Sequence, residues 1–307
     1  MVNKEQSDSA RKNSSTSSFG VSKREGHDAS QYYSSRLYSG MQTERDVGEE
    51  SPFPEDMIDR IIEADSRKMT LIPDNSVHLM VTSPPYNVTK DYDDDLSLPE
   101  YLSLLQDVFA EVWRVLVPGG RAVINIANVG RKPYIPLASH VNLIMQELGF
   151  LMRGEVIWDK SASAGSSTAW GSFQSASNPC LRDVHEYILI FSKGSFGLPR
   201  SADEKQAGRI DSIQKQEFID LTKSIWSFPT ESAKRVSHPA PFPVELPRRC
   251  IEFYTFCGDV VLDPFCGSGS TAVAAKQTAR SYICFDINAE YIEIARQRVV
   301  DAPNPSE

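Results

Sequence analysis

Short apolar runs alternate with amphipathic segments along the chain from Ile58 onward. Residues 77–81 (VHLMV) form a largely apolar run that ends at the sequence TSPPYN, which predicts a buried strand that leads into a loop. Residues 99–116 then carry apolar side chains at helical spacing, namely Leu102, Leu105, Phe109, Val112, Trp113 and Leu116. The Pro-Gly-Gly sequence at 118–120 is expected to end this helix before a strand at 122–127.

The same alternation continues toward the end of the chain. It predicts helices at about 140–148, 270–278 and 289–300, and strands at about 151–158, 186–191, 260–262 and 282–285. Strands that alternate with helices are typical of an α/β fold, with a mainly parallel sheet covered by helices on both faces.

Three intervals do not follow this alternation. Residues 1–52 include 11 serines by position 39 and have almost no apolar periodicity, so we expect a disordered N-terminal arm followed by one domain at 53–307. Within that domain, 161–182 and 194–223 are rich in small or polar residues. Long irregular segments of compact α/β domains often contact ligands, so both are candidates for substrate contact.

A glycine-containing loop follows the predicted strand at 260–262. In the sequence DPFCGSGST, Gly267 and Gly269 let the backbone approach a ligand closely, and the free N–H groups at the start of the next helix favour an anionic group. The loop lacks the third glycine of a dinucleotide fingerprint and the Gly-Lys-Ser/Thr of a phosphate loop, which disfavours NAD and ATP. Asp286 stands at the end of the next predicted strand, 17 positions after Gly269, where its carboxylate can accept hydrogen bonds from both hydroxyls of a ribose. A nucleoside with an amino-acid tail fits these features better than a dinucleotide does.

The loop at 82–87, Thr-Ser-Pro-Pro-Tyr-Asn, carries a second set of chemical groups. Its two prolines restrict the backbone and remove two N–H donors, so the loop is stiff and presents carbonyl acceptors. The Ser83 hydroxyl can hydrogen-bond an exocyclic amino group, and Tyr86 offers a flat face for stacking on a base. The amino nitrogen of cytosine or adenine is a poor nucleophile because its lone pair is delocalised into the ring. Holding its N–H bonds in acceptors frees that lone pair to attack a methyl sulfonium.

Composition and charge exclude several classes of protein. The 307 residues are 40% hydrophobic and 24% charged, as in ordinary globular proteins, and no apolar run approaches the ~20 residues that span a bilayer. We therefore expect a cytoplasmic protein that does not act at a membrane. The five cysteines form no Cys-x-x-Cys pair and no Cys/His cluster, so we expect neither a metal site nor disulfides. With a net charge of −9, any binding of nucleic acid needs a locally basic cleft.

Three motifs together resemble one enzyme family. TSPPYN near the start, LDPFCGSGST near the end and HPAPFP at 238–243 are similar to the S-adenosylmethionine-dependent DNA amino-methyltransferases in the circularly permuted order called the beta class. The resemblance spans about Asp65 to Arg298 and includes the stretches VLVPGGRAVINIAN, RGEVIWDK, HEYILIFSKG and IWSFP. It implies a Rossmann-like methyltransferase fold with a mainly parallel seven-stranded sheet, and S-adenosylmethionine as the cofactor.

The resemblance also implies roles for residues in these motifs. The cofactor-binding residues carried over from it are Asp263, Phe265, Gly267, Gly269, Ser270, Asp286, Pro239 and Phe242. Among them, Asp286 would hold the ribose, and Pro239 to Phe242 would close the pocket. The catalytic pocket that receives a base flipped out of double-stranded DNA would consist of Ser83, Pro84, Pro85 and Tyr86.

Ser83 bears on the identity of the methylated base. A serine at this position is similar to the cytosine-N4 enzymes, whereas the adenine-N6 enzymes more often have an acidic residue there. Methylation of cytosine carbon 5 needs a nucleophilic cysteine backed by Glu-Asn-Val, and Cys180 follows a proline but the chain contains no Glu-Asn-Val. Methyltransferases of RNA or of protein glutamine also use a Pro-Pro-Tyr loop, but their glycine loop usually comes first, whereas here it comes about 180 residues later. We expect direct in-line transfer to the N4 amino group of cytosine at a specific DNA site, with adenine N6 as the alternative.

Basic residues are the candidates for contact with DNA. They are Arg131, Lys132, Lys193, Lys234, Arg235, Arg248 and Arg249. Residues 194–224 lie where related enzymes place a small target-recognition insertion, in which Arg200, Arg209 and Lys215 can reach bases or phosphates. The stretches NVGRKPY and WGSFQSASNP are similar to archaeal-type enzymes that act on CTAG. The resemblance also implies a location at the nucleoid and a restriction endonuclease that acts on the same site, whereas the sequence indicates no oligomeric state.

Overall fold

The structure is a computed structural model that describes residues 33–86, 96–160, 171–198, 209–231 and 242–305. Contacts divide the chain into a short unit up to Gln42 and a main unit from Thr43 to Glu307. The described part of the short unit contains one turn of 3-10 helix, η1 (Arg36–Tyr38), and the rings of Tyr33 and Tyr38 meet edge-on at 5.1 Å. All features discussed below belong to the main unit.

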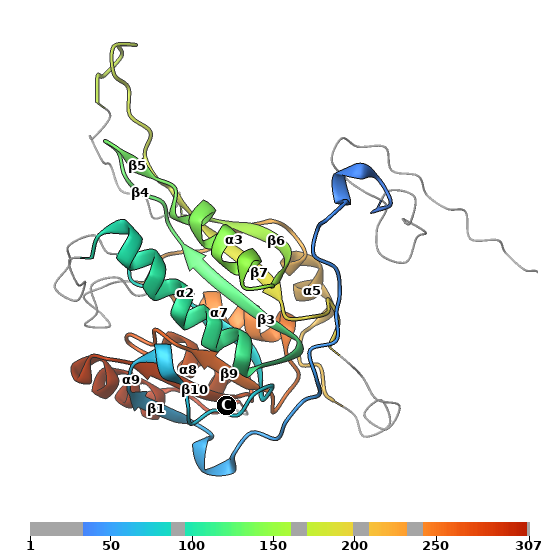
Figure 1. Ribbon diagram of the computed structural model, residues 1–307. Helices are drawn as coiled ribbons and strands as arrows, with labels where there is room; N and C mark the ends of the chain where they lie inside the picture. The colour runs from blue at the N-terminus through green and yellow to red at the C-terminus, as the bar shows by residue number, and fades with distance from the viewer. Residues whose placement is uncertain (1–32, 87–95, 161–170, 199–208, 232–241, 306–307) are drawn as a thin grey trace, which may run out of the picture. The chain divides into compact units, whose positions relative to one another are not determined.

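The main unit is built on an eight-stranded sheet (Figure 1). In spatial order the strands are β1 (Arg60–Glu63), β10 (Ser281–Asp286), β9 (Val260–Asp263), β2 (Val77–Thr82), β3 (Leu116–Ile126), β7 (His185–Ser192), β6 (Leu151–Asp159) and β8 (Ile225–Ser227). Of these strands only β7 is antiparallel to its neighbours, so the sheet is mainly parallel as expected. The expected number of seven strands is wrong by one. The two edge strands β1 and β8 bury one residue each, so neither has an apolar pattern that marks it in the sequence.

Helices cover both faces of the sheet. In β2, Leu79 and Val81 pack into the core beneath α7 (Glu245–Tyr254), α8 (Ser270–Gln277) and α9 (Ala289–Asp301). Met80 packs into the other core, beneath α2 (Leu98–Val115) and α3 (Leu137–Glu147). A strand buried on both faces is mostly apolar, which explains the largely apolar run at 77–81. None of the described helices is long and apolar enough to cross a bilayer.

The helix α2 begins and ends close to the predicted positions. It starts with a capping box in which Glu100 Oε2 accepts from the Ser97 backbone N–H at 2.9 Å, and it ends at Val115. The Pro-Gly-Gly sequence at 118–120, expected to separate helix from strand, lies inside β3 instead and interrupts its register with β2. Gly119 has φ +74°, and a Cβ on it would lie 2.0 Å from the Gly197 carbonyl oxygen, so only glycine fits this bulge.

The carboxyl ends of the parallel strands meet at one edge of the sheet, which we call the carboxyl edge. The strands β1, β10, β9, β2 and β3 end there, and the antiparallel β7 begins there. The TSPPY loop follows β2, and the DPFCGSGST loop follows its neighbour β9. The two motifs are about 180 residues apart in the sequence. The strand order nevertheless places them side by side.

Residues 43–52 lie along the opposite edge, which we call the amino edge. The Arg45 backbone N–H donates to the Gly194 carbonyl at 2.7 Å, and Glu50 hydrogen-bonds His78 at 3.0 Å and pairs with Arg209 at 3.0 Å. The hydrogen bond to His78 and the charge of Arg209 lower the pKa of Glu50 to about 2. The expectation that the disordered arm extends to residue 52 is therefore wrong for 43–52, because these residues bond to the domain.

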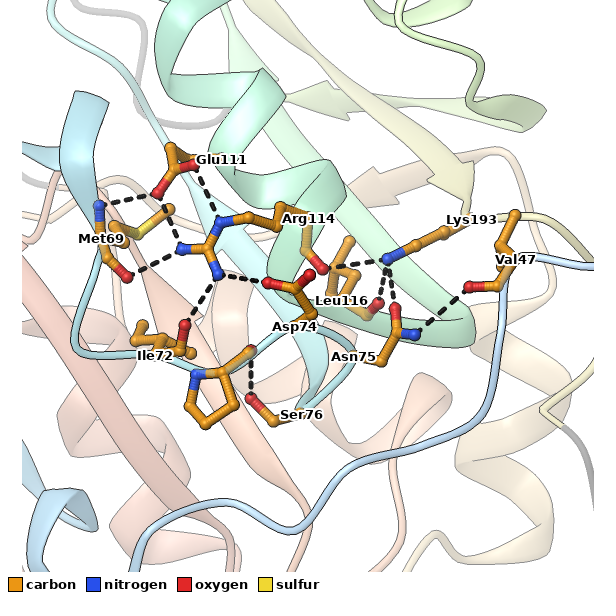
Figure 2. A network of polar contacts seen from close by, with 11 residues as sticks. Val47, Met69, Ile72, Asp74, Asn75, Ser76, Glu111, Arg114, Leu116 and Lys193 are labelled. Carbon is orange, nitrogen blue, oxygen red and sulfur yellow. Dashed lines mark hydrogen bonds and ion pairs between the residues drawn. The ribbon is translucent and has the colours of Figure 1, made fainter.

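Figure 2 shows a network at the amino edge around Arg114 and Lys193. Arg114 donates to the carbonyl oxygens of Met69 and Ile72 at 2.9 and 2.8 Å, which holds the loop that precedes β2. Lys193 is 3% exposed, and its Nζ donates to Asn75 Oδ1 at 2.5 Å and to two backbone carbonyls. Burial lowers the pKa of Lys193 to about 8. The expectation that Lys193 contacts DNA does not fit this buried position.

The segment that follows β7 also lies along the amino edge. The strand β7 ends at Ser192 on that edge, and the Cys257 backbone N–H, just before β9, donates to the Ile210 carbonyl at 2.9 Å. The helix α5 (Lys215–Leu221) then packs beside α7 before β8 joins the sheet. Residues 194–198 and 209–212 therefore lie on the edge opposite the two motif loops. The expectation that 194–224 forms the target-recognition insertion does not fit this position.

We expect a chain that begins at Thr43 to be as stable as the full-length protein. A chain that begins at Phe53 should unfold about 2–6 °C lower, because it loses the hydrogen bonds of Arg45 and the ion pairs of Glu50. Thermal denaturation of the three chains, followed by circular dichroism, measures these midpoints. Equal midpoints for the two truncated chains would show that residues 43–52 do not stabilise the domain.

Candidate active site

A cavity of about 550 Å³ opens at the carboxyl edge. The first motif contributes Ser83, Pro84, Pro85 and Tyr86 to its wall, and the second contributes Pro264, Phe265, Cys266, Gly267, Ser268 and Ser270. Asp286 at the end of β10, Asn125 in β3 and Glu186 in β7 also line it. The cavity therefore extends along the ends of five neighbouring strands, with a β10 half on one side and a β7 half on the other.

Asp263 connects the two motif loops. Its Oδ1 accepts hydrogen bonds from Thr82 Oγ1 at 2.7 Å and from the Phe265 backbone N–H at 3.1 Å, and its Oδ2 accepts from Thr271 Oγ1 at 2.7 Å. The residue is fully buried, and burial raises its pKa to about 6 although the hydrogen bonds oppose the rise. Asp263 is absent from the wall of the cavity, and its hydrogen bonds to Thr82 and Thr271 hold both loops behind that wall.

The glycine loop and Asp286 form the β10 half of the cavity. The Gly267 backbone N–H donates to Asp286 Oδ2 at 2.7 Å, and the Asn288 backbone N–H donates to Oδ1 at 2.9 Å. Burial raises the pKa of Asp286. Phe265 and Ile287 add apolar surface to the same wall. A carboxylate acceptor beside apolar side chains fits the ribose and the base of a nucleoside.

Gly269 and Ser270 begin the helix α8 beside this half. Gly269 has φ +81°, and a Cβ on it would lie 2.7 Å from the Cβ of Ala295 in α9. Glycine is needed here for the close approach of two helices, and Gly269 does not line the cavity. Ser270 does line it, and its Oγ donates to the Phe242 carbonyl at 2.8 Å, which brings Phe242 to the wall.

A polar network fills the β7 half. Ser83 Oγ lies 3.1 Å from Tyr86 OH, and Tyr86 OH donates to Glu186 Oε2 at 3.1 Å. Lys160 Nζ pairs with Glu186 Oε1 at 2.5 Å. Burial and the neighbouring Glu186 raise the pKa of Tyr86 well above its usual range, so the phenol keeps its proton and acts as a donor.

Asn125 leaves one acceptor of this network without a partner. Its Nδ2 donates to Glu186 Oε2 at 2.5 Å, so the amide nitrogen faces the carboxylate and Oδ1 points away from it. Asn125 is 1% exposed, and its Oδ1 has no hydrogen-bond partner among the described residues. A buried acceptor without a donor is unfavourable by about 1–3 kcal/mol. Nδ2 also lies 3.4 Å from Ser83 Oγ and 3.3 Å from Tyr86 OH, so Asn125 turns its donor side toward these groups and Oδ1 points away from them.

The sequence analysis did not single out Asn125, Glu186 or Lys160. Each is one polar residue in or next to an apolar strand, and the pairing of β3, β7 and β6 brings the three strands together. The only signal in the sequence is a polar side chain within a run that is buried on both faces, such as the asparagine in AVINI.

Comparison with known proteins identifies the family. The N6/N4 DNA methylase model matches residues 77–297. The chain belongs to the N6/N4 DNA methylase family. It is 33% identical over 281 residues to the type II methyltransferase M.MjaI of Methanocaldococcus jannaschii, and the match covers 78% of this chain and 90% of M.MjaI. The chain is therefore a DNA methyltransferase.

Solved structures show the same fold as this DNA methylase. TTHA0409 of Thermus thermophilus, described as a DNA modification methylase, matches with a TM-score of 0.63 and 30% identity over 79% of this chain and 95% of that one. TTHA0409 has also been solved in complex with S-adenosyl-L-methionine. The cytosine-N4-specific PvuII DNA methyltransferase matches with a TM-score of 0.60 and 21% identity over 84% of this chain and 89% of that one, which supports the fold.

Most of the predicted site residues of this DNA methylase line the cavity. They are Ser83, Pro84, Pro85, Tyr86, Phe242, Phe265, Gly267, Ser270 and Asp286. Asp263 and Gly269 lie behind the wall and position it. Pro239 lies outside the described residues. The described residues contain no group of His, Cys, Asp and Glu that could hold a metal ion.

The basic candidates for DNA contact separate between different parts of the fold. Arg131 and Lys132 are exposed in the hairpin that follows β3 at the carboxyl edge. Arg248 and Arg249 lie on α7 and both pair with Glu245. Lys234, Arg235 and Arg200 lie outside the described residues. Of these four described residues, Arg131 and Lys132 lie at the same edge as the cavity, and Arg248 and Arg249 do not.

We expect Asp263→Asn to change the pH dependence of stability. The folded-state pKa of Asp263 is about 6, above its usual value of 3.8, so the folded protein binds this proton more readily than the unfolded chain does. The stability of the wild type relative to the variant should therefore rise as the pH falls from 7 to 4, by about 2 kcal/mol. Urea denaturation of both proteins across this range measures the difference, and parallel profiles would contradict the assignment.

Proposed function

We propose that this DNA methylase transfers the methyl group of S-adenosylmethionine to the N4 amino group of cytosine at a specific site in double-stranded DNA. The observation that carries the proposal is that Ser83 and the Pro-Pro-Tyr loop line one cavity with the glycine loop and Asp286. An exocyclic amine carries two N–H donors and matches the hydroxyl oxygen of Ser83 and the backbone carbonyls of this loop, in which two prolines lack N–H groups. A ligand group with oxygen acceptors alone does not.

The β10 half fits S-adenosylmethionine. Asp286 can accept hydrogen bonds from the ribose hydroxyls, and Phe265 and Ile287 offer apolar surface to the adenine. When bound, the cofactor supplies a methyl group activated by a sulfonium. The related methylase TTHA0409, solved with this ligand, supports the assignment.

The β7 half receives the base. A base inside a duplex cannot reach a cavity at the end of a sheet, so the target nucleotide must be flipped out of the stack. We assign Ser83 Oγ and a backbone carbonyl of the Pro84-Pro85 loop as acceptors for the two N–H bonds of the amine. With both bonds held, the nitrogen lone pair is available for in-line attack on the methyl carbon. Pro84 and Pro85 keep the loop stiff while this happens.

Glu186 sets the direction of the hydrogen bonds in this half. The single proton of Tyr86 OH goes to Glu186, so Tyr86 can only accept from Ser83. The Ser83 proton is then directed away from the base, and its oxygen lone pairs face the amine. After methyl transfer the amine nitrogen must lose a proton. The chain from Ser83 through Tyr86 to Glu186 offers a path to a carboxylate.

Ser83 supports cytosine over adenine, because the adenine enzymes of this resemblance more often have an acid at this position. The related M.MjaI is a type II methyltransferase, which supports action at a defined DNA sequence and a companion endonuclease for the same sequence. Methylation of adenine N6 is the second candidate, since an adenine amine presents the same two donors.

We expect duplex DNA incubated with the protein and tritiated S-adenosylmethionine to yield labelled N4-methylcytosine after digestion to nucleosides. Chromatography against standards identifies the product. Labelled N6-methyladenine would replace the cytosine proposal with the adenine one. The absence of any labelled nucleoside, with label on RNA or protein instead, would reject both.

We expect Glu186→Gln to lower kcat by about 10²-fold or more, because the glutamine amide no longer fixes Tyr86 as a donor and cannot receive a proton. The affinity for S-adenosylmethionine should stay within about twofold, since Glu186 lies in the other half of the cavity. Single-turnover kinetics and calorimetry measure the two quantities.

The matched control is Asp286→Asn in the β10 half. It should weaken S-adenosylmethionine binding by about tenfold, as expected when a charged acceptor is replaced by an amide. If Glu186→Gln weakens cofactor binding as much as Asp286→Asn does, Glu186 does not act on the base.

A further inference from the structure

Two protrusions leave the carboxyl edge on the side of the β7 half. One is the hairpin of β4 (Val129–Gly130) and β5 (Tyr134–Ile135), and the other is the described part of the β6–β7 connection, residues 171–184. We call them the hairpin and the arm. Figure 1 shows that both extend away from the sheet beyond the strand ends. The β10 half has no such protrusion among the described residues that surround it.

Each protrusion is continuous with a residue of the base-binding half. The hairpin begins a few residues after Asn125, and the arm leads directly into Glu186. Tyr187 lies in β7, where it pairs with Ile126 of β3, the strand before the hairpin, and with Ile157 of β6, the strand before the arm. A duplex held on the hairpin and the arm would therefore present its flipped base to the β7 half.

The hairpin is anchored at its base and exposed at its tip. Val129 and Ile135 pack against the core beneath α2 and α3, and they pair with each other across the hairpin. Arg131 and Lys132 occupy the turn and are exposed. The chain as a whole has a net charge of −9, so phosphate groups can be attracted only where positive charge is concentrated locally. The two cations on the otherwise uncharged hairpin tip form such a local site.

Backbone hydrogen bonds close the arm at its base and near its tip. The Lys160 N–H donates to the Val184 carbonyl at 2.8 Å, which extends the β6–β7 ladder, and the Ser172 N–H donates to the Asn178 carbonyl at 2.9 Å near the tip. Gly171 bridges to Pro179, and a Cβ on Gly171 would lie 2.1 Å from the Asn178 carbonyl oxygen. An exposed segment closed this tightly can present its side chains in fixed positions.

The arm exposes several side chains of kinds that can contact DNA bases or phosphates. Phe173 is 64% exposed and Leu181 is 89% exposed, so both keep most of their apolar surface in water. Gln174 follows Phe173 at the tip with φ +52°, a left-handed conformation that is uncommon outside glycine. Apolar wedges enter base steps, amides read adenine edges, and arginines such as the exposed Arg182 bind phosphate or guanine.

We infer that the hairpin at 129–135 and the arm at 171–184 form the surface that holds double-stranded DNA and reads its sequence. This inference rests on the proposed DNA substrate of the cavity. It assigns to the β3–β7–β6 side of the carboxyl edge the role that the sequence pattern suggests for 194–224. The described residues 194–198 and 209–212 lie at the amino edge, where Arg209 already pairs with Glu50.

Removal of the hairpin charges tests the contact with phosphates. We expect Arg131→Ala/Lys132→Ala to raise KM for unmodified plasmid DNA by about tenfold and to leave kcat within about twofold. The slope of log affinity against log salt for duplex DNA should fall by about 1.8, since each lost phosphate contact removes about 0.9. Filter binding over a salt series and initial rates with tritiated S-adenosylmethionine measure these changes.

The matched control removes the same charge from residues 194–224. Arg200→Ala/Lys215→Ala should leave KM and the salt slope unchanged. If the control variant loses DNA affinity as much as or more than the hairpin variant, the assignment of the surface is overturned. It is also overturned if neither variant changes the salt slope.

A second variant tests the reading of sequence by the arm. Gln174→Gly keeps the left-handed backbone, which glycine adopts without strain, and removes the amide side chain. We expect sequencing of methylated plasmid to show at least about tenfold more methylation, relative to the preferred site, at sites that differ from it by one base pair. Unchanged site preference in both Gln174→Gly and Phe173→Ala would refute sequence reading by the arm.

The two proposals fail in different ways. If the wild-type protein methylates no DNA, the proposed function fails before the variants are compared. If the wild type methylates DNA and the hairpin and arm variants match it in KM, salt slope and site preference, only the surface is wrong. Calorimetry with S-adenosylmethionine, which binds in the other half, shows that each variant is folded.

Discussion

Hydrogen bonds from Thr82 and Thr271 to the buried carboxylate of Asp263 connect the two loops on which the active site depends. Backbone pairing between β2 and β9 extends over only two residue pairs and ends at Met80 and Leu262. Beyond that point, hydrogen bonds to the side chain of Asp263 connect the two segments where backbone pairing has ended. The chain leaves β9 toward β10 through α8 on one face, and it leaves β2 toward β3 through α2 on the other. Loops that diverge in this way open a crevice at the carboxyl ends of parallel strands, which is where α/β proteins bind ligands.

The buried carboxylate of Asp263 lowers the stability of the folded protein but fixes the positions of the two loops. Burial raises the pKa of Asp263 to about 6 despite three hydrogen bonds, so ionising this group in the folded protein is unfavourable relative to water. A hydrophobic residue would fill the same volume without that penalty, but it would leave Thr82, Thr271 and the Phe265 N–H without their acceptor. A residue that is not the most stabilising one is expected where a protein must hold the parts of a functional site in position.

The sequence predicts the helices and strands that have a clear apolar periodicity. It does not predict features that depend on which strands pair with each other. Strands such as β2 and helices such as α2 have long, strong apolar patterns, and both form close to the predicted residues. The strands β1 and β8 bury one residue each and leave no such pattern. The motifs identify one wall of the cavity, but Asn125, Glu186 and Lys160 meet only because three strands pair side by side. Likewise, no local pattern shows that β7 is antiparallel, and its direction is what sends residues 194–198 to the amino edge.

The polarity of the half proposed to bind the base follows from the same strand arrangement. With Ser83 directed as proposed, its oxygen faces the base as an acceptor beside the carbonyls of the proline loop. Cytosine and adenine place an amine at the matching edge, whereas thymine and guanine place a carbonyl oxygen there. A carbonyl would leave these acceptors without donors, at about 1–3 kcal/mol each, while a tighter apolar pocket could separate bases only by size. In the proposed mechanism, the carboxylate of Glu186 acts on the choice of substrate without touching the base, because it determines which way the Ser83 hydroxyl points.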